Sequence, residues 1–169
     1  LDTSRFVAAG FSAGGHLAAM LALAHGTGSG AHAGSAEHGG QLLDLGDDSH
    51  VDGLVAISGV HSAGTLLDDR PGLPTCGALW TADPYYCASV PRRAGTNCMV
   101  GLFLGCSDLQ SCTAPSVPAT TIHYAHAAAP PSLLVHGDDD CWVAANQSQR
   151  LYTALRAAGA ADTTLSLRA

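Results

Sequence analysis

Short apolar runs alternate along the chain with longer stretches rich in alanine and leucine. The apolar runs predict β-strands at residues 6–9, 51–59, 132–136 and 163–167. The longer stretches predict helices at residues 13–25 and 144–158. The run at 51–59 is apolar on both faces, as expected for a central strand of a parallel sheet. This alternation predicts an α/β fold, with a parallel sheet of about four strands, flanking helices and right-handed crossovers.

Two segments interrupt the alternation. Residues 26–50 are rich in glycine, alanine, serine and histidine, which predicts a long surface excursion. Residues 61–129 carry five of the six cysteines and six of the eight prolines. We therefore expect a loop-rich, cap-like insertion, tied by disulfides, within a single domain that comprises residues 1–169. Its aromatic residues either line a substrate pocket or form a small core of their own: Trp80, Tyr85, Tyr86 and Phe103.

A G-x-S-x-G spacing, with Ser12 between Gly10 and Gly14, joins the first strand to the first helix. We expect chain and helix to pass so close to this serine that a Cβ at either glycine would clash. Ser12 would then stand on a strained corner with an exposed hydroxyl, and the N–H of Ala13 would face an oxyanion. This context predicts a nucleophile. The alternative is a serine with a purely structural role in the turn.

These residues resemble the nucleophile elbow of the α/β-hydrolases, specifically esterases of the hormone-sensitive-lipase and feruloyl/xylan-esterase-like kind. A second match is P-P-S-L-L-V-H-G-D-D-D-C-W-V at residues 130–143, similar to the family's strand and acid loop. Residues 2–7 and 146–159 resemble the lead-in to the elbow and the helix after the acid loop. The similarity is weaker between about Gly26 and Gln110. It implies a partial α/β-hydrolase fold whose cap insertion shapes the substrate pocket.

The resemblance assigns the catalytic acid to Asp140, three residues after Gly137. Asp139 and Asp138 are the alternatives within the same run. The alternative to a catalytic role is that the three aspartates form a solvated acidic loop, with at most weak affinity for a cation.

The chain order Ser, Asp, His of this fold places the catalytic histidine after the acid. No histidine follows His136, so none of the nine stands in the expected position. We weigh His16, His123, His126 and His136 as substitutes, and we expect the base to lie outside this chain. His16 and His136 match positions that the family uses for structural hydrogen bonds.

The chain has 169 residues and begins at the elbow strand, so we interpret it as the C-terminal half of a larger hydrolase or as a truncated relative. The family's H-G-G-G-type oxyanion loop precedes the serine, so the H-G-G run at residues 38–40 does not represent it. We expect one edge of the elbow strand to be bare and to favour self-association.

Charged residues make up 12% of the chain and the formal net charge is −7, which disfavours nucleic acid as a partner. No apolar run approaches the ~20 residues of a membrane span. Neither a metal nor another cofactor is expected, because the cysteine spacing fits no zinc pattern. Asn146 begins an N-x-S sequon, but it more simply caps the helix that follows.

Six cysteines, an even number, predict disulfides and an oxidising compartment, so we expect a secreted or periplasmic protein. Two pairs bracket short loops and are our predicted disulfides, Cys76 with Cys87 and Cys106 with Cys112. Cys98 and Cys141 would then pair with each other or stay free.

The predicted function is a serine hydrolase that cleaves carboxylic esters through an acyl-enzyme intermediate. Its expected substrates are small-molecule or carbohydrate esters, with acetyl, feruloyl or other small acyl groups. A prolyl-oligopeptidase-like peptidase is one alternative, and a truncated, non-catalytic or binding remnant is the other.

Overall fold

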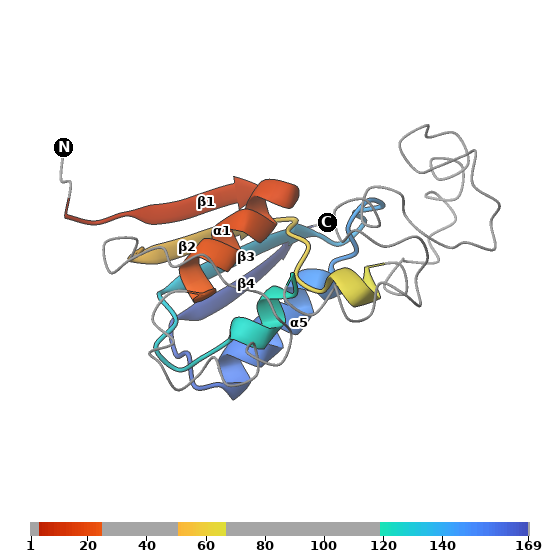
Figure 1. The fold of residues 1–169 in the computed structure, drawn as a ribbon. Coiled ribbons are helices and arrows are strands. Elements are labelled where there is room, and N and C mark those ends of the chain that lie inside the picture. The colour runs from red at the N-terminus through yellow and green to blue at the C-terminus, as the bar shows by residue number, and fades with distance from the viewer. Residues whose placement is uncertain (1–3, 25–50, 67–118, 169) are drawn as a thin grey trace.

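The computed structural model describes residues 4–24, 51–66 and 119–168 (Figure 1). These residues form four strands, two helices and two short helical turns: β1 (Val7–Phe11), α1 (Ala13–Ala24), β2 (Gly53–Ile57), η4 (Ala63–Thr65), η7 (Thr121–Tyr124), β3 (Ser132–Gly137), α5 (Asn146–Ala157) and β4 (Thr163–Arg168). Most of the predicted cap insertion and the surface excursion at 26–50 lie outside the described residues, so both stay predictions.

The four strands form one parallel sheet in the order β1-β2-β3-β4. Phe11 pairs with Ile57, and Ile57 pairs with Val135, so β1 and β2 end at the same level and β3 continues two residues further, to Gly137. All four arrowheads point toward one end of the sheet, where the loops after β1, β2 and β3 emerge (Figure 1). The predicted parallel α/β sheet is therefore confirmed.

One face of the sheet packs against α1, η7 and α5, and the described core lies between these layers (Figure 1). Its fully buried side chains come from both layers: Ala19, Leu23, Leu54, Ala56, Leu134, Leu151 and Leu155. The small alanines of α1 let this helix approach the sheet closely, because they add little bulk between the two backbones.

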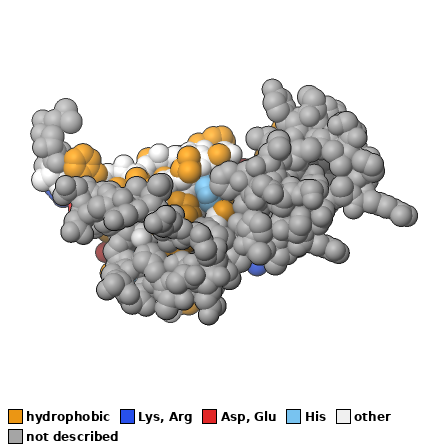
Figure 2. All heavy atoms as spheres, viewed as in Figure 1, with side chains coloured by type: hydrophobic (Ala, Val, Ile, Leu, Met, Phe, Trp, Pro, Cys, Tyr) orange, Lys and Arg blue, Asp and Glu red, His pale blue; other side chains and the backbone are white. Residues whose placement is uncertain are grey.

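The opposite face of the sheet is apolar but exposed. Val7 and Phe11 on β1 expose 61% and 67% of their surface, and Ile57 and Leu133 each expose 38%. Figure 2 shows the other side of the molecule, on which α1 lies, and apolar side chains are open there too. A parallel sheet is usually covered on both faces, so the exposed face opposite α1 is unusual for the fold class.

The ends of the elements differ slightly from their predicted positions. The first strand runs to Phe11 rather than to residue 9, and α5 begins at Asn146 rather than at residue 144. Asn146 is not the cap. Ala145 precedes the helix with φ −55° and ψ −25°, and its side chain makes no capping hydrogen bond. Because Ala145 is already helical, the turn through Ala144 leads directly into α5, and Asn146 lies within its first turn.

The C-terminus of α5 follows the prediction. Gly159 has φ +92°, its N–H donates to the carbonyl of Arg156 at 3.1 Å, and the N–H of Ala160 donates to the carbonyl of Leu155 at 2.9 Å. This pair of bonds is a Schellman motif, which turns the chain back toward β4.

Candidate active site

Ser12 occupies the corner between β1 and α1 and has φ +54°, in the left-handed region that non-glycine residues rarely adopt. Its N–H donates to the carbonyl of Ile57 at 2.8 Å, and its carbonyl accepts the N–H of His16 at 3.1 Å. The backbone bonds thus hold the corner to β2 and to the first turn of α1. Its half-buried side chain makes no hydrogen bond with another described residue.

The glycines around Ser12 differ in their roles. A Cβ at Gly10 would overlap the carbonyl of Gly14, as expected for the tight corner. A Cβ at Gly14 would meet nothing within 4 Å, so the predicted clash at that glycine is wrong. Gly15 is the second crowded position: its Cβ would lie 3.1 Å from the carbonyl oxygens of both Gly10 and Ile57. The close contact therefore joins α1 to both β1 and β2, and the spacing around the serine alone does not reveal the contact with β2.

Ala13 is exposed and is the first residue of α1. The first N–H groups of a helix have no acceptor within the helix, so this N–H can donate to a group placed beside Ser12. Its position is compatible with the predicted oxyanion contact.

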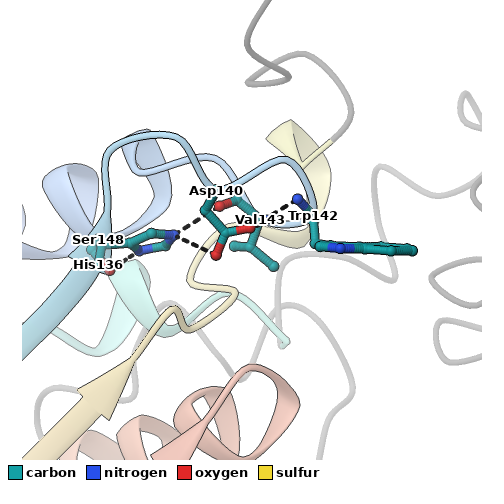
Figure 3. Close-up of polar contacts among 5 residues, drawn as sticks. All are labelled: His136, Asp140, Trp142, Val143 and Ser148. Carbon is teal, nitrogen blue, oxygen red and sulfur yellow. Dashed lines mark hydrogen bonds and ion pairs between the residues drawn. The ribbon is translucent and has the colours of Figure 1, made fainter. Parts of the chain in front are cut away.

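Asp140 lies in the loop between β3 and α5 (Figure 3). Its Oδ1 accepts the N–H groups of Trp142 at 2.8 Å and of Val143 at 3.0 Å. Its Oδ2 lies 3.7 Å from Nε2 of His136, and 18% of the Asp140 side chain is exposed. One carboxylate oxygen therefore organises the loop, whereas the other makes no hydrogen bond among the described residues. Asp138 and Asp139 are exposed.

His136 is buried at the end of β3 and uses both ring nitrogens (Figure 3). Its Nε2 lies 2.7 Å from the carbonyl of Val143, and its Nδ1 lies 2.7 Å from Oγ of Ser148. A carbonyl only accepts, so Nε2 donates to Val143, and Nδ1 shares a hydrogen bond with the Ser148 hydroxyl. His136 therefore ties the acid loop to α5.

The other three candidate histidines lie on separate elements. His16, on α1, donates from Nδ1 to the carbonyl of Val60 at 2.8 Å, and burial lowers its pKa despite that bond. His123 is exposed on η7. Burial lowers the pKa of His126 despite a bond to the carbonyl of Leu23, and its Nε2 has no partner among the described residues. None of them is hydrogen-bonded to the side chain of Ser12 within the described part of the chain.

Two buried residues that sequence reasoning missed connect the loop after β2 to α5. Gln147 accepts the N–H groups of His61 at 2.9 Å and of Ser62 at 2.7 Å, and donates to Oγ1 of Thr65 at 3.1 Å. Both His61 and Gln147 are fully buried. No local pattern signals these contacts, because Gln147 lies more than 80 residues from its partners.

His61 has an unusual environment. Thr121 donates its hydroxyl to the His61 carbonyl at 3.2 Å, so Nδ1 of His61 donates to that hydroxyl oxygen at 3.1 Å. Nε2 has no hydrogen-bond partner among the described residues and packs against Gly59. Burial, followed by repulsion from His16 and His136, lowers the pKa of His61 to about 3. The ring is therefore neutral at physiological pH.

Ser12 and Asp140 follow β1 and β3, which flank β2, so both residues lie at the carboxyl edge of the sheet. Two strand spacings, about 10 Å, separate the ends of β1 and β3.

Within the described ranges, no group of three or more His, Cys, Asp or Glu side chains is placed to hold a metal ion. None of the described helices is long and apolar enough to cross a membrane.

Solved structures with the same arrangement are α/β-hydrolases. A truncated form of a carbohydrate esterase from gut microbiota matches 99% of this chain and 52% of its own, with a TM-score of 0.65 and 22% identity. The Est2 esterase of Thermogutta terrifontis matches 96% of this chain and 44% of its own, with a TM-score of 0.52 and 20% identity. An acylaminoacyl peptidase of Pyrococcus horikoshii matches 100% and 20%, with a TM-score of 0.57 and 13% identity.

The chain thus has the α/β-hydrolase fold and spans about half, or less, of the length of these structures. Residues 6–164 match the family model described as serine hydrolase (FSH1), and the chain belongs to this family. No curated protein matches the sequence.

Proposed function

We propose that this chain carries the nucleophile and the acid of a hydrolase that cleaves carboxylic esters with acetyl, feruloyl or other small acyl groups. The observation that carries the proposal is the conformation of Ser12, with φ +54° at a strand–helix corner. Strain of this kind costs about 1–3 kcal/mol and persists where the surroundings enforce it, commonly at functional sites. Membership of a serine hydrolase family supports the same residue.

The chemistry follows from the positions of Ser12, Ala13 and Asp140. Oγ of Ser12 attacks the ester carbonyl carbon while a base takes its proton, and the N–H of Ala13 stabilises the oxyanion. The ester C–O bond then breaks, and the alcohol leaves with the proton from the base. Water hydrolyses the acyl-enzyme by the same steps and regenerates Ser12. Oδ2 of Asp140, which makes no hydrogen bond among the described residues, orients the base and stabilises its charged form.

We propose that the base is a histidine outside residues 1–169. His136 already uses both ring nitrogens, and burial disfavours the charged form of His16. A catalytic base must hold the proton that it takes from serine, so the lowered pKa of His16 weakens it as a substitute.

A carbohydrate-linked ester is the substrate class that we favour, with support from the carbohydrate esterase that shares this fold. A prolyl-oligopeptidase-like peptidase is the second candidate, because the acylaminoacyl peptidase matches the whole of this chain.

Secretion, or export to the periplasm, is proposed from the cysteines. Cys141 is disulfide-bonded, and the other five cysteines lie outside the described residues.

The proposal is tested with a fluorophosphonate probe and intact-mass analysis, on residues 1–169 alone and on any longer natural polypeptide that contains them. We expect one label, on Ser12, in the longer polypeptide, and loss of both label and p-nitrophenyl acetate turnover in Ser12→Ala. The matched control is Ser58→Gly, because Ser58 also has a positive φ (+46°) at a strand end but no helix follows it directly. Turnover that survives Ser12→Ala would refute the assignment.

The acid is tested in the same polypeptide with Asp140→Asn. The asparagine Oδ1 still accepts from Trp142 and Val143, so the loop should keep its shape while turnover falls ~10⁴-fold. Asp139→Asn is the control and should change turnover little, since Asp139 is exposed. A larger loss of turnover in Asp139→Asn than in Asp140→Asn would assign the acid to Asp139 instead. Paired ester and peptide substrates with the same acyl group separate the esterase from the peptidase.

A further inference from the structure

A surface groove of about 560 Å³ lies between α5 and η7, and neither Ser12 nor Asp140 lines it. One wall is a face of α5, and the other contains Thr120, Ile122 and His123. The volume falls within the range of small-molecule sites in proteins, ~300–1,000 Å³. Nothing in the proposed ester hydrolysis uses this groove.

The α5 wall is a row of neutral polar side chains. Asn146, Gln149 and Thr153 follow one another at intervals of three and four residues, so they share one helix face. The hydroxyl of Thr153 donates to the backbone carbonyl of Gln149 at 2.8 Å, which leaves its oxygen able to accept. Each amide offers two N–H donors and a carbonyl acceptor. The row can therefore both donate to and accept from hydroxyl groups.

Apart from the hydroxyl residues Ser62 and Thr120, the rest of the described lining is apolar or basic. Ile122, Ala154 and Ala157 supply an apolar surface beside the polar row, while His123 and Arg150 are exposed at the groove. Among the described residues, no aspartate or glutamate lines it, although the chain has 14 acidic residues against 7 basic ones. The groove therefore suits a ligand with an apolar face and many hydroxyl groups.

We propose that this groove binds a saccharide. A sugar ring has C–H faces that pack on apolar side chains and a rim of hydroxyl groups that donate and accept. The apolar surface at Ile122 and Ala154 and the amide row match these two features. A purely apolar ligand would leave the amides without partners, which is costly. The inference does not rest on the proposed ester hydrolysis, because it concerns binding of the unesterified sugar.

The test is a ligand-observed saturation-transfer NMR titration of residues 1–169 with three neutral disaccharides: xylobiose, cellobiose and mannobiose. This measurement works whether the chain is monomeric or associated. We expect saturation transfer to at least one disaccharide. Binding should be about tenfold weaker in Asn146→Ala/Gln149→Ala, because this double variant loses one or two neutral hydrogen bonds to the sugar. Thr153→Val, which keeps the side-chain shape, should weaken binding by a smaller factor.

The control variant is Thr164→Ala, an exposed substitution on β4 that should leave saccharide binding unchanged. Unchanged melting temperatures for all variants would show that binding, not folding, has been altered. Three outcomes overturn the proposal: no transfer to any of the disaccharides, equal binding by the double variant, or binding of inorganic phosphate alone, which would indicate an anion site. These measurements of sugar binding and melting temperature do not depend on ester hydrolysis, so they would not change if the proposed esterase activity were absent.

Discussion

The buried imidazole of His61 makes the stability of the fold depend on pH. Its pKa is lowered from 6.5 to about 3, mainly by burial, so the folded protein resists its protonation. In the unfolded chain the ring protonates near 6.5. Above that pH both states hold the neutral ring and stability is unaffected. As the pH falls below 6.5, only the unfolded state gains the proton, and stability is lost progressively until about pH 3.

We therefore predict that wild-type protein loses about 2 kcal/mol more of its unfolding free energy between pH 7.5 and 5 than His61→Gln does. Urea denaturation of both proteins at several pH values measures the difference. The comparison therefore reports on His61 together with its repulsion from His16 and His136. Parallel curves for the two proteins would mean that His61 is hydrated or protonated in the folded state.

At this scale the sequence predicted the residues whose role depends on near neighbours. Ser12 lies at its strand–helix corner because the glycine spacing and the following helix specify it locally. Gly14 and Gly15 mark the limit of such reasoning, since the crowding at Gly15 comes partly from Ile57 on β2, more than 40 residues away. His61 and Gln147 were missed for the same reason: their contacts exist only after the loop after β2 meets α5.

Among the elements, the C-terminal end of α5 depends most clearly on a single residue of the sequence, Gly159. Gly159 holds φ +92°, and an added Cβ would meet only Ala127, at an ordinary contact distance of 3.6 Å. Replacement by alanine therefore strains the backbone without a clash. We predict that Gly159→Ala lowers the unfolding free energy by roughly 1–2 kcal/mol.

Gly159→Asn is the matched variant, because asparagine tolerates the left-handed conformation and should lose less stability. Urea denaturation monitored by circular dichroism measures both variants against the wild type. Equal losses for the two would point to the added side-chain atoms, and not the backbone angle, as the cause.

All six predicted strands and helices that fall in the described part of the chain are present, and their ends shift by one or two residues. Element identity is set by runs of several residues, whereas an end depends on single hydrogen bonds. The start of α5 illustrates this. Asn146 has the composition of a cap, but the helical turn at Ala144 and Ala145 extends the helical path before it.

On the scale of the whole molecule, the described helices cover only one face of a sheet whose strands are apolar on both faces. The sequence predicted this two-sided apolar character at residues 51–59, and with it a bare edge at the elbow strand. β1 is an edge strand of the described sheet, and it contains no charge, proline or bulge. Those are the features with which natural edge strands avoid pairing with other chains.

We predict that residues 1–169 self-associate through β1, as two copies paired about a two-fold axis. Val7, 61% exposed on this strand, is the position to test. Val7→Lys places a charge on the edge, which should shift the protein toward monomer in sedimentation velocity runs over a range of concentrations. The control is Thr164→Lys on β4, the other edge of the sheet, where the exposed residue is already polar.

Both substitutions change the net charge from −7 to −6. The smaller magnitude weakens the repulsion between copies, which by itself favours association. A shift toward monomer in Val7→Lys alone would therefore come from the β1 edge and not from overall charge. Equal effects of the two lysines would place the contact elsewhere or spread it over both edges. A wild-type chain that stays monomeric at every concentration would show that exposed apolar side chains on β1 are tolerated without a partner.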